Sequence, residues 1–218
     1  MNNNVAIIDY HMGNLFSVEQ ACRNVGLNPI ITSKQTEIEN SDAVILPGVG
    51  AFPEAMNNLN KLNLIETLKK ILENEKPFMG ICLGFQLLFS GSEEFGNTKG
   101  LNVFPGQVKK FPTVSSTKSK IKVPQIGWNQ IHPYNSQKWK RSLLNGINNN
   151  EFMYFVHSYF VETEDDSITL TYTEYEGIKY CSSIEKDNVF ASQFHPEKSA
   201  YEGIKIYNNF ANSINQKD

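Results

Sequence analysis

The sequence has few cysteines and no excess of either charge. Its three cysteines, Cys22, Cys82 and Cys181, are an odd number at spacings typical of no metal motif, which argues against a disulfide framework and for a reducing compartment. Twenty Lys and Arg against twenty-three Asp and Glu leave a formal net charge of −3, so the chain has no overall positive field for nucleic acid or a membrane surface. Partners must therefore be recognised by local sites.

Long apolar runs are also missing. The first four residues include no basic residue, and the apolar run that follows them stops at Asp9, which is too short for a signal peptide or a membrane span. We therefore expect a cytoplasmic protein. With 40% hydrophobic and 20% charged residues, the composition is that of a globular protein, and we expect residues 1–218 to form one domain.

The N-terminal half alternates short apolar runs with helical patterns. Four runs predict strands buried on both faces: residues 5–8, 29–31, 43–46 and 78–81. Apolar residues at helical spacing predict helices over residues 15–25 and 65–72, ended by Gly26 and Pro77. This order predicts right-handed crossovers in an open, mainly parallel, doubly wound α/β sheet.

The C-terminal half has a different pattern. Aromatic and β-branched residues predict antiparallel strands added to the parallel sheet, over residues 152–161, 168–173, 177–183 and 189–194. A final helix is predicted over residues 201–214. Residues 109–122 are rich in Ser, Thr, Lys and Pro without a period, which predicts a solvated loop.

A cysteine lies between two glycines where a strand is predicted to meet a helix. Cys82 directly follows the run 78–81, which contains Gly80, and Gly84 precedes the apolar residues Phe85, Leu87, Leu88 and Phe89. This order predicts a strand, a sharp turn and a helix: a nucleophile elbow with sulfur in place of serine oxygen. A helix N-terminus stabilises thiolate, and the Leu83 N–H would face a developing oxyanion. The alternative is a buried structural cysteine beside packing glycines.

A base and a carboxylate follow the last predicted strand. A cysteine nucleophile needs an imidazole to take its proton and return it to the leaving group, and the imidazole needs an acceptor that fixes its tautomer. His195 and Glu197, separated by a proline, suit these roles. Taken singly, they also suit an exposed loop histidine and an acid at a helix N-terminus. His11 and His132 have no partner at metal-ligand spacing, and we predict neither metal nor cofactor.

Two other segments supply groups that could complete an active site around Cys82. Residues 47–52, Pro-Gly-Val-Gly-Ala-Phe, follow a buried strand and supply backbone N–H groups that complete an oxyanion hole; a simple tight turn is the alternative. Residues 154–159, Tyr-Phe-Val-His-Ser-Tyr, predict an aromatic strand that walls a pocket for a small polar amino acid. Core packing explains its aromatic residues equally well.

The combination of motifs resembles a known family. The Gly-x-Cys-x-Gly elbow followed by Gln86, with His-Pro-Glu far downstream, resembles the class I, triad-type glutamine amidotransferases. Within that group, five segments look like the amidotransferase subunit of imidazole glycerol phosphate synthase, and they span nearly the whole chain. These segments are residues 8–14, 47–52, 127–129, 154–159 and 194–199.

The resemblance implies a role for each site residue. Cys82 would form a glutamyl thioester that water resolves, with His195 as base and Glu197 orienting it. The oxyanion site would include a peptide that reorients at Val49 before its N–H faces the oxyanion. The residues implied at the oxyanion site are Val49, Gly50 and Leu83, and those implied around the glutamine are Gln86, His157, Ser158 and Tyr159.

The resemblance also implies a partner. A separate (β/α)₈-barrel synthase subunit would form a heterodimer with this chain and receive ammonia through an internal channel. The products would be imidazole glycerol phosphate and AICAR, in histidine biosynthesis. No cofactor is implied, and the only small-molecule substrate of this chain would be L-glutamine.

Three positions depart from the family pattern, namely His11 where glycine is usual, Phe85 where methionine or histidine is common, and Gln125 where histidine is frequent. They leave the ammonia acceptor open, since a related branch supplies ammonia for the amidination of surface-polysaccharide sugars. Two readings from other classes also stay open: a free-standing cysteine hydrolase, and a non-catalytic partner-binding module of the same fold.

Overall fold

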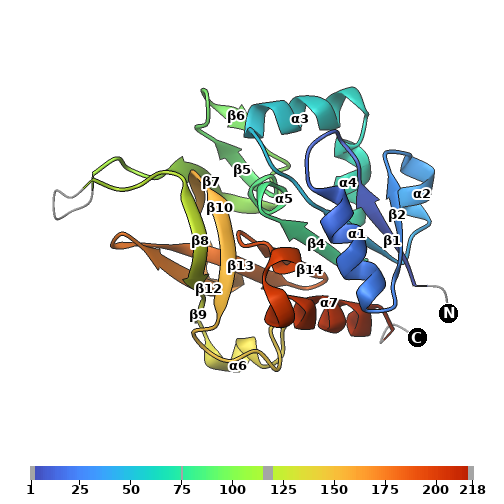
Figure 1. Cartoon of the computed structure of the whole chain (residues 1–218). Coiled ribbons are helices and arrows are strands. Elements are labelled where there is room, and N and C mark those ends of the chain that lie inside the picture. The colour runs from blue at the N-terminus through green and yellow to red at the C-terminus, as the bar shows by residue number, and fades with distance from the viewer. Residues whose placement is uncertain (1–2, 75, 115–119, 216–218) are drawn as a thin grey trace.

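The computed structural model describes residues 3–74, 76–114 and 120–215. Its main sheet has twelve strands, in the order β2-β1-β3-β4-β14-β13-β11-β7-β5-β6, with β12 paired to β13 and β9 paired to β12 (Figure 1). The strands of this sheet are β1 (Asn4–Ile8), β2 (Asn28–Thr32), β3 (Ala43–Leu46), β4 (Phe78–Ile81), β5 (Phe89–Ser92), β6 (Thr98–Lys99), β7 (Phe104–Lys110), β9 (His132–Pro133), β11 (Tyr159–Thr163), β12 (Thr169–Tyr175), β13 (Ile178–Lys186) and β14 (Val189–Ser192).

A second, two-stranded antiparallel sheet lies beside the first (Figure 1). Its strands are β8 (Gln125–Gln130) and β10 (Phe152–His157). The helices are α1 (Leu15–Asn24), α2 (Gln35–Glu39), α3 (Phe52–Lys61), α4 (Ile65–Glu73), α5 (Leu83–Gln86), α6 (Ser136–Trp139) and α7 (Ala200–Asn215), with the 3₁₀ turns η1 (Asp166–Ile168) and η2 (Pro196–Lys198). None of the helices in the described ranges is long and apolar enough to cross a membrane.

Five neighbouring strands, from β2 through β14, run parallel to one another. The antiparallel additions begin where β13 pairs with β14, so the predicted fold class is confirmed. The prediction for β14 itself was wrong in one respect, because this strand runs parallel to β4 and antiparallel only to β13. The parallel pairing with β4 brings the end of β14 next to the end of the strand that precedes Cys82.

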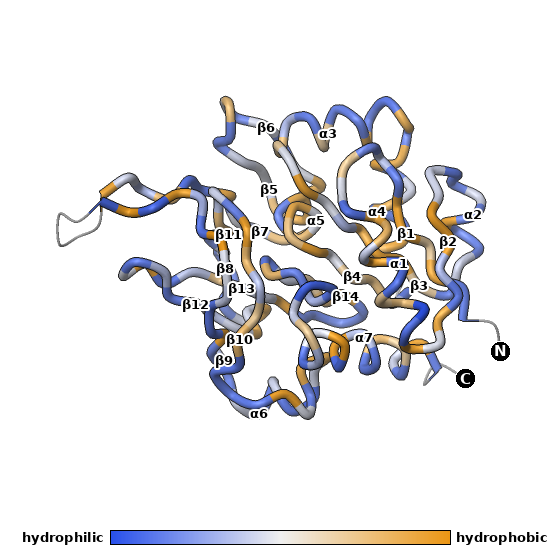
Figure 2. The backbone as a smooth tube through the Cα atoms, in the orientation of Figure 1, coloured by the Kyte–Doolittle hydropathy of each residue, from blue (hydrophilic) through white to orange (hydrophobic). Residues whose placement is uncertain are grey.

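Helices cover both faces of the parallel strands, and alternation along β1 shows the division. Val5 and Ile7 belong to one buried apolar cluster together with residues of α1 and α7. Ala6 and Ile8 belong to the other, together with residues of α2, α3 and α4. Figure 2 shows apolar residues gathered along the inner strands, with hydrophilic residues on the outer faces of helices such as α2 and α3. The predicted helices at residues 15–25, 65–72 and 201–214 are confirmed as α1, α4 and α7.

The strand predicted at residues 29–31 is present, but it is not buried on both faces. β2 ends the sheet order, with β1 as its neighbour, and Ile30 and Ile31 are 37% and 40% exposed. An apolar run does not show whether a second strand will pair with its other edge. The sequence pattern therefore predicted the strand but not its position at the edge of the sheet.

The helix predicted across residues 85–89 ends after one turn, at Gln86. The carbonyl oxygens of Leu87 and Leu88 accept hydrogen bonds from the N–H groups of Leu101 and Val103, at 2.8 Å each. These bonds replace the helical ones, and Phe89 begins β5 instead. A distant segment therefore overrides the local helical pattern.

Two further predictions were wrong in part. The strand predicted at residues 152–161 breaks at Ser158 into β10 and β11, which belong to different sheets. The loop predicted at residues 109–122 begins with the last two residues of β7, and Phe111 is buried among aromatic rings. Residues 115–119 of that predicted loop lie outside the described residues.

Candidate active site

Cys82 occupies the sharp turn between β4 and α5. Its backbone has φ 54° and ψ −105°, a left-handed φ that L-residues rarely adopt and that marks local strain. The turn needs the glycine that follows it, because a Cβ on Gly84 would overlap the carbonyl oxygen of Leu46 at the end of β3. The predicted order of strand, turn and helix is therefore present, although the helix is a single turn.

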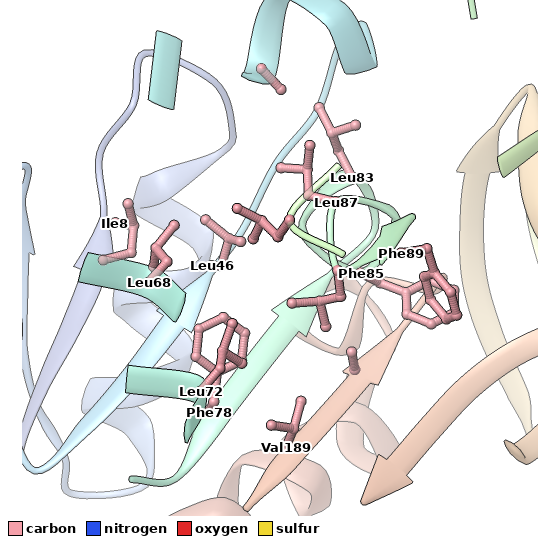
Figure 3. Close-up of a cluster of buried hydrophobic side chains, with 14 of the residues drawn as sticks. Ile8, Leu46, Leu68, Leu72, Phe78, Leu83, Phe85, Leu87, Phe89 and Val189 are labelled. Carbon is pink, nitrogen blue, oxygen red and sulfur yellow. The ribbon is translucent and has the colours of Figure 1, made fainter. Parts of the chain in front are cut away.

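Buried apolar side chains hold the short helix α5 against the core. Leu83, Phe85 and Leu87 are buried in the cluster that also holds Leu46 and Phe89, and Figure 3 shows them gathered around the end of β4. The rings of Phe85 and Phe89 meet edge to face, with centroids 5.3 Å apart. Phe85, one of the departures from the family pattern, therefore acts in packing beneath the elbow.

His195 and Glu197 form a buried pair just beyond β14. His195 Nδ1 lies 2.7 Å from Glu197 Oε1, and the two side chains are only 3% and 2% exposed. The backbone around them is tied down, because the hydroxyl of Ser199 donates to the carbonyl oxygen of His195 at 2.7 Å and accepts from the N–H of Tyr154 at 3.0 Å. Among the described residues, His195 Nε2 has no hydrogen-bond partner, so this nitrogen is available for a proton.

The surroundings favour the protonated, charged form of His195 and the neutral form of His157. Burial opposes the charged form of His195, but the Cys82 thiolate and the Glu197 carboxylate outweigh it and raise the pKa of this imidazole. Burial lowers the pKa of His157 to about 4. His157 Nδ1 lies 2.8 Å from the carbonyl oxygen of Tyr159, which can only accept, so this neutral ring carries its proton on Nδ1.

A cavity of about 410 Å³ opens beside Cys82, within the size range of small-molecule sites. It brings together Cys82 and all the residues predicted for the oxyanion and glutamine positions, whereas His195 and Glu197 are not part of its lining. The full lining is Val49, Gly50, Cys82, Leu83, Gln86, Glu94, Pro124, Val156, His157, Ser158, Tyr159 and Lys198.

Sequence reasoning missed some of this lining, above all Glu94. This carboxylate comes from the loop after β5, accepts a 2.7 Å hydrogen bond from the Phe52 N–H, and has its pKa raised by partial burial. The sequence offers no local signal for it, since the cavity is assembled from distant segments. Among the described residues no group of three or more His, Cys, Asp or Glu is gathered to hold a metal ion.

The predicted oxyanion donors are not all free in this conformation. The N–H of Leu83 donates to the carbonyl oxygen of Gly48 at 3.3 Å. Gly50 has φ 111°, and a Cβ there would lie 2.6 Å from Met12 Cε, so the glycine lets the segment fit closely beneath the loop after β1. The segment 48–50 therefore lies against the elbow, and one predicted oxyanion donor, the Leu83 N–H, is already hydrogen-bonded to it.

The other two departures from the family pattern are His11 and Gln125, and in the described part of the chain neither is hydrogen-bonded to His195 or Glu197. His11 has φ 67°, a conformation that explains why glycine suits this position, and its N–H donates to Asp9 Oδ1 at 3.0 Å. Gln125 is buried and accepts from the hydroxyl of Tyr180 at 3.0 Å, and the same hydroxyl lies 3.3 Å from His157 Nε2. Gln125 thus supports the cavity wall through Tyr180.

Comparison with known proteins agrees with this geometry. The family described as "Glutamine amidotransferase class-I" matches residues 6–214. The chain is 47% identical to the imidazole glycerol phosphate synthase subunit HisH of Caldanaerobacter subterraneus, over 96% of this chain and 98% of that one. It is 46% identical to the subunit HisH of Aquifex aeolicus, over 94% of each.

Solved structures show the same fold at low identity. A glutamine amidotransferase superposes with a TM-score of 0.71 at 15% identity, covering 97% of this chain and 98% of that chain. PurLQS from Thermotoga maritima superposes with a TM-score of 0.70 at 18% identity, covering 98% of this chain and 99% of that chain. The chain therefore belongs to the class-I glutamine amidotransferases and, within that family, to the HisH subunits of imidazole glycerol phosphate synthase.

Proposed function

We propose that this chain is a glutaminase that hydrolyses L-glutamine at Cys82 and delivers the ammonia to a (β/α)₈-barrel synthase subunit. That subunit would use the ammonia to make imidazole glycerol phosphate and AICAR in histidine biosynthesis. The observation that carries the proposal is a cysteine on a strained elbow, in the wall of a cavity, with a buried His195–Glu197 pair beside it.

The proposed chemistry has two halves. His195 Nε2 takes the thiol proton, and Cys82 Sγ attacks the side-chain amide carbon of glutamine to form a tetrahedral oxyanion. Collapse breaks the C–N bond, His195 returns the proton to the leaving ammonia, and a glutamyl thioester remains. Water then attacks the thioester, with His195 as base, and releases glutamate. Glu197, at 2.7 Å from Nδ1, holds the ring in the required tautomer and stabilises the imidazolium.

The cavity suits a zwitterionic amino acid. Glu94 and Lys198 place one carboxylate and one ammonium on its lining, which complement the α-ammonium and α-carboxylate of glutamine. Gln86, His157, Ser158 and Tyr159 line the remaining wall. We assign them to binding the substrate rather than to proton transfer. Burial lowers the pKa of His157 to about 4, so its ring is a weak base.

The oxyanion groups suit a gated enzyme. With the Leu83 N–H bonded to Gly48, the segment 48–50 must reorient before Leu83 and a second N–H from Val49 or Gly50 face the oxyanion. Loss of one oxyanion donor costs about two to three orders of magnitude in rate. Glutamine hydrolysis by the chain alone would then be slow, and partner binding would accelerate it.

An exposed apolar face beside the cavity is where we place the partner. Ile126 and Trp128 on β8 are 60% and 53% exposed, and Phe152 on β10 is 49% exposed. Trp128 meets the ring of Tyr154 across the two strands, with centroids 6.2 Å apart. Contiguous apolar patches of this kind mark interaction surfaces. Val156 of the same two-stranded sheet lines the cavity, so a partner seated here would adjoin the site of ammonia release.

The test is glutamate release from glutamine, with and without the histidine-pathway barrel subunit and its nucleotide ligand. We expect strong stimulation by the barrel subunit and none with Cys82→Ala. Trp128→Ala should weaken the stimulation, whereas Ile31→Ala, a matched exposed apolar truncation on β2, should not. Absence of glutamate from the complete mixture would overturn the proposal. Glutamate release without any response to the barrel subunit would point to another ammonia acceptor, such as a sugar-amidinating enzyme.

A further inference from the structure

A buried glutamine outside the predicted site contacts the nucleophile directly. Gln193 follows β14, is fully buried, and has its backbone N–H bonded to the Ser182 carbonyl oxygen at 2.9 Å. Its side-chain Nε2 lies 3.6 Å from Cys82 Sγ. We infer that Gln193 is a further catalytic residue, whose side-chain N–H donates to the sulfur and stabilises the thiolate. The inference rests on the proposed function of Cys82.

The orientation of the Gln193 amide follows from the chain of hydrogen bonds that ends on it. The nitrogen and oxygen of a glutamine amide are assigned from their partners, so an anchor of known polarity is needed. The carbonyl oxygen of Tyr159 supplies it, because it can only accept and lies 3.0 Å from Gln86 Nε2. The same Nε2 donates to Gln193 Oε1 at 2.9 Å. The Gln193 oxygen is thereby occupied, and its nitrogen must face the sulfur.

The sulfur needs such a donor once it loses its proton. As a thiol, Cys82 can donate to the carbonyl oxygen of Val156, at 3.9 Å. As a thiolate it can only accept, and the Val156 carbonyl then presents its negative end to a charge on a residue that is only 5% exposed. A buried charge without a hydrogen-bond partner is costly. The Gln193 N–H supplies a partner besides the His195 imidazolium, whose pKa the thiolate raises, in every step that regenerates the thiolate.

The chain of amides also links the substrate cavity to the nucleophile. Gln86 lines the cavity, and its two acceptors, Tyr159 O and Gln193 Oε1, account for both hydrogens of its nitrogen. A displacement of Gln86 would therefore change the position of the Gln193 amide and its contact with the Cys82 sulfur. The measurement must therefore separate a catalytic role for Gln193 from a role in supporting Gln86 alone.

The test compares Gln193→Met with Gln125→Met. Both replace a buried glutamine by a side chain of similar length without a donor, but the amide of Gln125 contacts Tyr180 rather than the sulfur. The rate of iodoacetamide alkylation at Cys82 is measured against pH by peptide mass spectrometry, which needs no glutamine. We expect the midpoint of the Gln193→Met profile to rise by about one pH unit, a tenfold loss of thiolate at neutral pH. The Gln125→Met midpoint should match the wild-type value.

A second variant and a kinetic readout keep the test decisive. If Gln193→Met does not fold, Gln193→Leu carries the same test, since its side chain also offers the sulfur no donor; its midpoint should rise by a similar amount. In glutamine hydrolysis kcat should fall about tenfold or more, with KM within about threefold.

Superimposable alkylation profiles for wild type and a folded Gln193 variant would overturn the inference, as would a rise in KM with unchanged kcat. A shifted profile in a protein that releases no glutamate would leave the contact between the Gln193 N–H and the Cys82 sulfur standing but remove the proposed function, and with it the catalytic role of Gln193.

Discussion

The hydroxyl of Tyr10 donates a 2.7 Å hydrogen bond to the carbonyl oxygen of Pro47, and both residues are buried. A Cβ on Gly48 would overlap this hydroxyl, so the tyrosine ring and the glycine fit only together. The contact joins the loop after β1 to the first peptide of the segment that lines the cavity. It fixes one end of that segment while Val49 and Gly50, farther along, lie exposed at the cavity.

Tyr10→Phe should lower the free energy of unfolding by about 1 to 2 kcal/mol, because it leaves the buried Pro47 carbonyl oxygen without its partner. Urea unfolding followed by circular dichroism measures the change. Tyr201→Phe is the matched control, since Tyr201 is 73% exposed, and its effect should stay within about 0.5 kcal/mol. Equal unfolding midpoints for Tyr10→Phe and wild type would contradict the anchoring role.

Glu197→Gln should reduce the kcat of glutamine hydrolysis by about two to four orders of magnitude, because the amide no longer supplies the charge that stabilises the His195 imidazolium. The pKa of His195, which Cys82 and Glu197 raise in the native protein, should fall in the variant, as NMR titration of the ring would detect. Glu202→Gln, which removes a carboxylate paired with Lys205 in α7, should change kcat by less than about threefold. Similar kcat values for the two variants would exclude an orienting role for Glu197.

Iodoacetamide at pH 8 should modify Cys82 well before Cys22 or Cys181. Burial raises the pKa of each of the latter two thiols to about 12, so almost none of either is thiolate at that pH, whereas Cys82 lines the cavity. Peptide mass spectrometry after timed quenching gives the order. In urea all three cysteines should react, and a native protein labelled equally at all three would show the burial argument to be wrong.

Glu185→Gln should stabilise the protein at pH 8 and have little effect at pH 4. Burial raises the pKa of Glu185 to about 7 from an ordinary value of 4.5, against the opposing effects of the Leu143 N–H and Lys138. Because the folded state holds this proton more tightly than the unfolded state, its stabilising contribution is complete below pH 4.5 and is lost as the pH rises through 7. A glutamine keeps an acceptor for Leu143 without the charge, so the variant should gain about 1 to 3 kcal/mol at pH 8 relative to wild type. Thermal unfolding midpoints across this range would show the crossover, and a constant difference would refute it.

Local patterns in the sequence were enough for the features that neighbouring residues determine. The run 78–81, the cysteine between two glycines, and the apolar spacing of α1 and α7 gave the elbow and its flanking elements. The edge position of β2 and the early end of α5 depend on pairing with distant segments, which periodicity does not report. Gln193 escaped prediction for the same reason, since it meets Gln86 across 107 positions and Cys82 across 111.

In the proposed gating, the hydrogen bond between the Leu83 N–H and the Gly48 carbonyl oxygen is the contact that a partner has to break to activate the chain. A single backbone hydrogen bond contributes about 1 kcal/mol to a folded state, which is far less than the free energy of even a micromolar association, about 8 kcal/mol. Even a weakly bound partner therefore has enough binding energy to break this hydrogen bond, and the bond would re-form when the partner dissociates. On that proposal the chain is inactive until a partner binds, so glutamine is not hydrolysed in the partner's absence and no separate inhibitor is needed.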